Sequence, residues 1–221
     1  QDNNIRLDCV LDEGGAILPV NVKGVLNKNL AGIGVAEKGY ADFEIAVTAK
    51  GGHSSQSPNH TALGHLADVI KDIENNQFKA ELSPMMMQLF EKIGRNCSYP
   101  VRLITCNTKI LKPLITKLMT FIPPAASLIR TTQGVTMASG SPAPNVLPQR
   151  ASVNVNVRIY PGETVEDVEK HFRKVIKNKK TEIILKPGWK NPSKISPTDT
   201  RCFKAIEEIC YNTYDIMERC L

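Results

Sequence analysis

The sequence has little of what several protein classes require. Aromatic residues make up 5% of the 221 residues and include one tryptophan, so few rings can stack on nucleic-acid bases. The six cysteines form no C-x-x-C pair, which argues against a zinc knuckle or a redox motif. No apolar run reaches the roughly 18 residues that a membrane span needs. We therefore expect no nucleic-acid partner, no membrane partner, and reduced thiols in a cytoplasmic protein.

The remaining composition is typical of a folded globular chain. Apolar residues make up 42% and charged residues 23% of the sequence, which is enough to form a core. The net charge of +6 is diffuse, and its densest stretch, Lys170 to Lys180, has the spacing of a solvated helix face. The chain starts without a methionine and passes quickly into an apolar run. This start suggests a fragment excised from a longer protein.

Hydrophobic periodicity predicts the central part of the chain as an α+β domain. Alternating apolar residues indicate half-buried strands, and apolar residues at i, i+3, i+4 and i+7 indicate amphipathic helices. In chain order the pattern predicts strand, helix, strand, strand, helix and strand over 40–49, 63–73, 131–138, 151–159, 164–176 and 181–185. This order is that of the ferredoxin-like βαββαβ fold.

The other segments are expected to flank or interrupt this domain. Residues 5–11 read as a buried strand that ends at the Asp12-Glu13-Gly14-Gly15 loop, and a loop rich in glycine and asparagine follows. Residues from about 80 to 128 have a helical pattern and are treated as an insertion. We expect domain boundaries at 1–36, 37–187 and 188–221, with a last helix from about 200 to 211.

Short motifs in a fixed order give the chain a family resemblance. They are Leu11-Asp12-Glu13-Gly14-Gly15, Glu37-Lys38-Gly39, Gly52-His53-Ser54-Ser55, Asn145-Val146-Leu147-Pro148 and Arg158-Ile159-Tyr160-Pro161-Gly162. Together they resemble the two-zinc metallopeptidase family of aminoacylase, carboxypeptidase S and succinyl-diaminopimelate desuccinylase. The helical insertion and Arg130-Thr131-Thr132 favour the carboxypeptidase S branch. The resemblance implies a ferredoxin-like lid that mediates dimerisation, flanked by fragments of an α/β zinc-peptidase catalytic domain.

The resemblance also implies roles for individual residues. His53 would reach the active site of the partner subunit and stabilise the tetrahedral oxyanion. Arg158 would bind the free carboxylate of the substrate, and Asn145 would hydrogen-bond the substrate or the oxyanion. Either Asp12 or Glu13 would bind zinc, with Asp12 favoured by the carboxypeptidase S branch.

Each of these residues also has an ordinary explanation. A single histidine in a loop is more often a solvated side chain, and we interpret His60, His65 and His171 in this way. Arg158 would serve equally well as a cation on an exposed strand face. Most Asp-Glu-Gly segments are surface turns.

The resulting prediction is a zinc-dependent hydrolase of peptide or N-acyl amino acid amide bonds, of which this chain is the homodimeric lid. Two zinc ions are expected in the parent protein. None is expected in this chain, because the family's H-x-D motif, second aspartate, glutamate pair and late histidine are missing from it. The chain alone is then expected to be inactive. The alternative is a purely non-catalytic association module.

Overall fold

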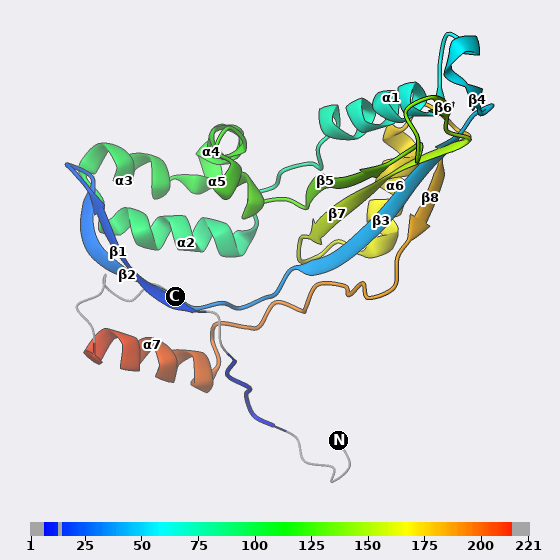
Figure 1. Cartoon of the computed structure of the whole chain (residues 1–221). Helices are drawn as coiled ribbons and strands as arrows, with labels where there is room; N and C mark the ends of the chain where they lie inside the picture. The colour runs from blue at the N-terminus through cyan, green and yellow to red at the C-terminus, as the bar shows by residue number, and fades with distance from the viewer. Residues whose placement is uncertain (1–6, 13–14, 214–221) are drawn as a thin grey trace. The chain divides into compact units, whose positions relative to one another are not determined.

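The structure is a computed structural model that describes residues 7–12 and 15–213 and divides into two compact units (Figure 1). The first, here called the lid unit, comprises residues 37–80 and 126–194. The second, here called the flanking unit, comprises the described residues within 1–36, 81–125 and 195–221. The domain boundaries expected from the sequence stay predictions.

The lid unit contains one four-stranded antiparallel sheet in the order β5-β7-β3-β8. Two helices complete the order strand, helix, strand, strand, helix, strand, so the predicted ferredoxin-like fold is confirmed. The elements are β3 (Gly39–Thr48), α1 (Ala62–Asn75), β5 (Thr132–Ser139), β7 (Arg150–Ile159), α6 (Val165–Val175) and β8 (Glu182–Leu185).

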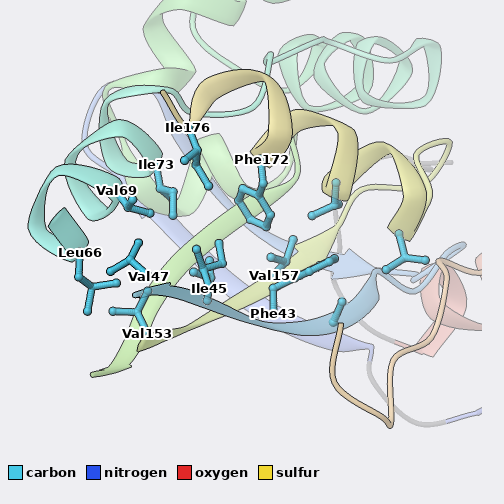
Figure 2. Packing of buried hydrophobic residues seen from close by; sticks show 14 of the residues in the cluster. Phe43, Ile45, Val47, Leu66, Val69, Ile73, Val153, Val157, Phe172 and Ile176 are labelled. Atoms are coloured by element: carbon cyan, nitrogen blue, oxygen red, sulfur yellow. The ribbon is translucent and has the colours of Figure 1, made fainter. Parts of the chain in front are cut away.

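The core of the lid unit lies between this sheet and its two helices. Figure 2 shows apolar side chains of α1 and α6 directed at the same face of the sheet. The Phe43 and Phe172 rings meet edge to face with centroids 5.3 Å apart, a geometry that aromatic pairs prefer. The largest buried side chains of this cluster are Phe43, Ile45, Val47, Leu66, Val69, Ile73, Ile159, Phe172 and Ile176.

Polar side chains fix the ends of both lid helices. The Thr164 hydroxyl and the Asp167 carboxylate form a capping box at the start of α6. Near the end of α1, the buried Asp72 carboxylate accepts a hydrogen bond from the Lys177 backbone N–H at 3.0 Å. It also lies 3.1 Å from the Lys177 ammonium. The backbone hydrogen bond lowers the pKa of Asp72, so its charged form stabilises the contact between α1 and the segment after α6.

The flanking unit contains a hairpin that the sequence analysis missed. The stretch expected to be a loop forms β1 (Ala16–Val22) and β2 (Leu26–Gly32), which pair in antiparallel register. Gly24 makes the turn possible, because its φ of +74° lies in the left-handed region. Glycine and asparagine favour loops, but here Gly24 lies in the three-residue turn, and Asn21, Asn27 and Asn29 lie in the paired strands.

The expected buried strand at 5–11 is wrong over its described part. Residues 7–12 have no strand conformation, and Leu7, Val10 and Leu11 are exposed. No strand in the described ranges pairs with this segment, and an apolar run forms a strand only where a neighbour accepts its backbone hydrogen bonds. Residues 5 and 6 lie outside the described residues.

The helical insertion and the last helix are confirmed. The insertion folds as α2 (Pro84–Arg95), α3 (Tyr99–Thr105), α4 (Thr108–Thr120) and α5 (Pro123–Ser127), and the last helix is α7 (Arg201–Thr213). Ser83 caps α2, because its hydroxyl accepts a hydrogen bond from the Met86 N–H at 3.3 Å. Within the described ranges, no helix combines the length and the apolar character needed to cross a bilayer.

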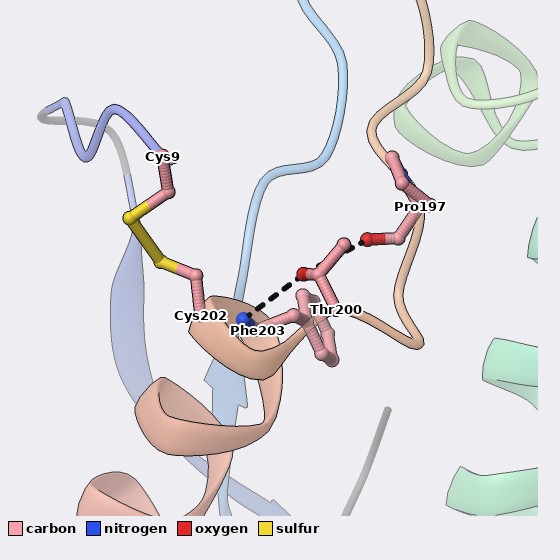
Figure 3. Close-up of a disulfide and its surroundings, with 5 residues drawn as sticks. All are labelled: Cys9, Pro197, Thr200, Cys202 and Phe203. Carbon is pink, nitrogen blue, oxygen red and sulfur yellow. Dashed lines mark hydrogen bonds between the residues drawn. A yellow bond between two sulfur atoms is a disulfide. The ribbon is translucent and has the colours of Figure 1, made fainter. Parts of the chain in front are cut away.

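A disulfide joins Cys9 to Cys202 within the flanking unit (Figure 3). Their Cα atoms are 6.4 Å apart, inside the usual range for a disulfide. The expectation of reduced thiols is therefore wrong for this pair, because residues 193 positions apart in the sequence are brought together by folding. The described cysteines Cys97, Cys106 and Cys210 are free thiols, and Cys220 lies outside the described residues.

Replacing Cys202 by serine is expected to lower the free energy of unfolding by about 2–4 kcal/mol, because the disulfide closes a long loop in the unfolded chain. Urea denaturation under oxidising conditions measures this difference. Cys210→Ser on the same helix is the matched control and should change stability by less than about 1 kcal/mol. Equal losses in the two variants would contradict a stabilising disulfide.

Candidate functional site

His53 and Asn145 are brought together at one end of the lid sheet. The short strands β4 (Gly52–His53) and β6 (Val146–Leu147) pair in antiparallel register, with His53 opposite Val146. The Ser54 N–H donates a hydrogen bond of 3.0 Å to the Asn145 carbonyl oxygen. Residues that are 92 positions apart in the sequence thus form one exposed loop pair.

The His53 ring is oriented by the residues that follow it. The Ser55 backbone N–H donates to His53 Nδ1 at 3.2 Å, and Ser55 Oγ lies 2.8 Å from the same nitrogen. Because Nδ1 accepts a hydrogen bond, the neutral ring carries its proton on Nε2. The exposed ring can therefore offer an Nε2–H donor to a negatively charged oxygen.

A pocket of about 490 Å³ adjoins this loop pair. Its lining is Gly51, Gly52, His53, Gly140, Pro142, Val146, Leu147, Pro148, Gln149 and Arg150. Gly51 permits the close approach of the two loops, because a Cβ at this position would lie 2.5 Å from Gln149 Cγ and 3.0 Å from the Leu147 carbonyl oxygen. A Cβ at Gly52 would meet nothing within 4 Å.

Gly51→Ala is expected to displace the loop that carries Asn145 and to lower the free energy of unfolding by about 1–2 kcal/mol, because the added methyl overpacks the site. Thermal unfolding measures the loss, and the NMR signal of the His53 ring reports the displacement. Gly52→Ala is the control, with open space for its methyl group. A His53 signal that moves equally in both variants would argue against the role given to Gly51.

Arg158 lies at the opposite end of the sheet. Its side chain is exposed on the polar face, and its Cζ atom lies 4.8 Å from the centroid of the Tyr40 ring. This contact is a cation–π interaction, which holds the guanidinium over the ring. Tyr40 was not predicted as a site residue, because its position opposite Arg158 depends on the register between β3 and β7.

A second missed residue, Asp42, organises the same face of the sheet. Its carboxylate accepts hydrogen bonds from Asn154 Nδ2 at 2.8 Å and Asn156 Nδ2 at 3.0 Å, and from the Tyr40 hydroxyl. Desolvation alone would raise the pKa of Asp42, but these hydrogen bonds outweigh it and lower the pKa. The ionised Asp42 thereby positions Tyr40 beneath Arg158.

One lid cannot bring Arg158 and His53 to the same substrate. Arg150, at the start of β7, lines the pocket beside His53, whereas Arg158 lies eight residues farther along the same strand. At roughly 3.3 Å per residue, eight residues of strand span about 26 Å. This separation within one chain is compatible with the expectation that His53 acts in the active site of the partner subunit, which stays a prediction.

Two further family motifs fix the chain where the insertion returns to the lid. The Lys38 ammonium donates to the carbonyl oxygens of Ser127 and, at 3.0 Å, of Arg130. Burial lowers the pKa of Lys38. The buried Thr131 hydroxyl donates to the Glu163 carboxylate and accepts from the Tyr160 N–H at 2.7 Å. These contacts give the Glu37-Lys38-Gly39 and Arg130-Thr131-Thr132 segments a structural role.

Among the residues that the structure describes, the candidate zinc ligand Asp12 belongs to no metal site. Asp12 is exposed, and Glu13 lies outside the described residues. In the described part of the chain, no three His, Cys, Asp or Glu side chains come together as a group able to hold a metal. Because a catalytic zinc needs three protein ligands, the donor set present does not fit such an ion.

Comparison with known proteins places these features in a family context. The family described as the peptidase dimerisation domain matches residues 35–183. A probable carboxypeptidase S-like protein of Dictyostelium discoideum is 32% identical over 90% of this chain and 38% of its own length. The N-fatty-acyl-amino acid synthase/hydrolase of Homo sapiens is 29% identical over 91% of this chain and 40% of its own length.

A solved structure agrees on the fold. A metallo-carboxypeptidase from Sulfolobus solfataricus superposes with a TM-score of 0.53 at 18% identity, covering 84% of this chain and 45% of that one. At this identity the likeness shows the fold alone. The chain thus spans about 40% of the length of the curated relatives it matches.

Proposed function

Because the chain belongs to the peptidase dimerisation domain family of the M20 hydrolases, we propose that it is the dimer-forming lid of a longer zinc-dependent hydrolase. The proposed reaction is the cleavage of an amide bond beside a free carboxylate, in a peptide or an N-acyl amino acid. The relatives named above, a carboxypeptidase S-like protein and an N-fatty-acyl-amino acid hydrolase, support this substrate class. The chain alone is expected to be inactive, because most of the family's zinc-ligand motifs are missing from its sequence and its described residues form no group able to hold a metal.

The dimer contact proposed here is the free edge of β5. This strand has β7 on one side and no strand on the other among the described residues. Its eight residues, Thr132–Ser139, include no charged residue and no proline. The other edge, β8, has four residues and carries Glu182. Since charge and shortness protect a sheet edge from pairing, β5 is the edge suited to a second copy.

Pairing of two β5 strands would bring the His53 end of one lid's sheet beside the Arg158 end of the other lid's sheet. A twofold axis makes the two strands antiparallel, so the end of one lies beside the start of the other. The start of β5 pairs with Arg158, and Gly140, just after its end, lines the pocket with His53. One lid's His53 would then face the partner's copy of the Arg158 end. The observation that carries the proposed function is that the pocket with His53 and the residue Arg158 lie at opposite ends of one sheet.

The proposed roles follow from the side-chain chemistry. The Arg158 guanidinium, held over Tyr40, would form paired hydrogen bonds with the substrate carboxylate. From the other subunit, His53 Nε2–H would donate to the oxyanion that forms when the amide carbonyl is attacked. Asn145, beside His53, would donate to the same oxygen or to the substrate. Asp12 or Glu13 would supply one zinc ligand, and the other ligands and the general base that activates water would come from the rest of the longer protein.

The longer protein is expected to cleave an N-acyl amino acid about 10 to 100 times more efficiently than its methyl ester, because the ester removes the charged partner of Arg158. The ratio of kcat/KM values for the two substrates measures this preference. Arg158→Ala should bring the ratio close to one by slowing cleavage of the free acid.

Arg150→Ala is the matched control for that experiment. This arginine lies on the same strand but pairs with Glu44 at 2.7 Å, so the preference for the free acid should be retained. A preference that survives Arg158→Ala would contradict the role of Arg158 as the carboxylate ligand.

We also propose an oxidising compartment in place of the cytoplasm expected from the sequence. The Cys9–Cys202 disulfide supports this placement, because such bonds are rare where glutathione keeps thiols reduced. Peptide mapping of the protein from its native source, with free thiols blocked at lysis, tests it. Recovery of Cys9 and Cys202 as two separately blocked thiols would overturn the proposal.

A further inference from the structure

The helical insertion exposes an unusual number of large apolar side chains. On α4, Ile110, Leu114 and Leu118 are separated by four residues each, and Phe121 follows directly after the helix. This spacing places them on one side of the helix. Ile110 is 79% and Phe121 73% exposed. Tyr99 and Leu103 on the neighbouring α3 are exposed as well. These six residues are here called the α3–α4 apolar patch.

The patch is not the face by which α4 packs in its own unit. That face is formed by Thr108, Ile115 and Met119, which are buried. Thr108 donates a hydrogen bond of 2.9 Å to the Glu91 carboxylate of α2. Helix α4 therefore has two apolar faces, and an ordinary surface helix needs one. The second face requires another occupant.

The charge around the patch indicates what this occupant is. Residues 96–125 contain four basic residues and no acidic residue. Lys112 pairs with Glu81 at 3.2 Å, whereas no ion pair involves Arg102, Lys109 or Lys117 within the described ranges. Long basic side chains beside an apolar surface can keep their charge in water while their methylenes stay on that surface. Exposed apolar residues with basic side chains beside them are typical of helices that lie in the interface of anionic membranes.

We propose that the α3–α4 apolar patch docks on a lipid bilayer that contains anionic phospholipid. The apolar side chains would enter the acyl boundary, and Arg102, Lys109 and Lys117 would face the headgroups. This contact is peripheral, so it is compatible with the absence of a spanning helix from the described part of the chain. It revises the expectation of no membrane partner, which considered spanning segments only.

Co-sedimentation of the whole chain with vesicles tests the proposal. We expect partition to phosphatidylcholine vesicles with three-tenths phosphatidylserine to be about 10 to 100 times stronger than to pure phosphatidylcholine, since each basic residue near an anionic surface adds to binding. Leu114→Ser combined with Leu118→Ser should remove most of the binding. Lys109→Glu combined with Lys117→Glu should abolish the preference for anionic vesicles.

The matched control is Leu18→Ser combined with Val22→Ser on β1. These residues are 55% and 50% exposed in the same unit, comparable with Leu114 at 48% and Leu118 at 53%. The control should bind as the unchanged chain does, and circular dichroism should show that all variants are folded. Equal losses in the two apolar variants, or equal binding to both vesicle types, would overturn the proposal.

Two further outcomes would assign the patch to another occupant. In the first, the chain does not bind vesicles but forms oligomers, and the double variant Leu114→Ser with Leu118→Ser dissociates these oligomers. The occupant of the patch is then a second copy of the chain. If the chain binds vesicles and the longer protein does not, the rest of that protein covers the patch. Either result overturns the lipid proposal and leaves the proposed hydrolase function intact, because neither measures catalysis.

Discussion

In the longer protein, His53→Ala is expected to lower kcat by about 100- to 1000-fold, because one preorganised donor to the oxyanion is lost. KM should change little, since the proposed contact forms in the transition state. The orientation of the ring supports this role, with Nδ1 accepting from the Ser55 N–H and Nε2 left as the donor. Steady-state kinetics on an N-acyl amino acid measures the loss.

Mixing the His53→Ala and Arg158→Ala proteins is then expected to restore activity. A heterodimer would hold one site with an intact Arg158 and an intact His53 from the other subunit, and a second site that lacks both. Because random exchange makes half of the dimers mixed, the mixture should recover about a quarter of the unmutated activity. The strand length of about 26 Å between the two ends of one lid is the physical reason to expect this complementation.

The control for complementation is a mixture of His53→Ala with Asn145→Ala. Both residues lie on the same loop pair. Each of the two sites in a heterodimer would therefore receive a loop pair with one mutated residue from the other subunit. No recovery above the activity of the separate variants is expected. Recovery here, or its failure in the Arg158 mixture despite subunit exchange, would contradict a site shared between subunits.

Met137→Lys is expected to weaken dimerisation about 10- to 100-fold. Met137 is 71% exposed near the middle of β5, where an antiparallel twofold pairing places each residue close to its own copy. Two lysines would therefore approach each other across the axis, and like charges brought together at an interface oppose association. Sedimentation velocity over a concentration series measures the dissociation constant of the chain.

Ile184→Lys on β8 makes the same kind of change at the opposite edge of the sheet. Ile184 is 47% exposed, and the proposed dimer does not use this strand. Its dissociation constant should equal that of the unchanged chain. If Ile184→Lys dissociates the dimer and Met137→Lys has no effect, the β5 contact is contradicted and the dimer contact lies at the β8 edge.

The sequence by itself determined the type and order of the lid elements. Alternation along Tyr40 to Ala49 and 151–159, and helical spacing in the two helices, are local consequences of burying one face of each element. The capping box of α6 is local as well, because Thr164 and Asp167 are only three residues apart. The motif that contains His53 was identified through its resemblance to a family, and its role stays a prediction.

Tertiary structure decided which distant residues meet. The Cys9–Cys202 disulfide, the stacking of Tyr40 beneath Arg158 and the Lys38 contacts join segments that no local pattern connects. The same holds for the segment 7–12, whose apolar residues predict a strand but have no neighbouring strand among the described residues. Periodicity indicates whether one face of a helix or strand is buried, and it contains no information on which element packs or pairs with that helix or strand. For that reason only the folded sheet showed that the pocket beside His53 and the residue Arg158 lie at opposite ends of β7, which supports the shared-site proposal.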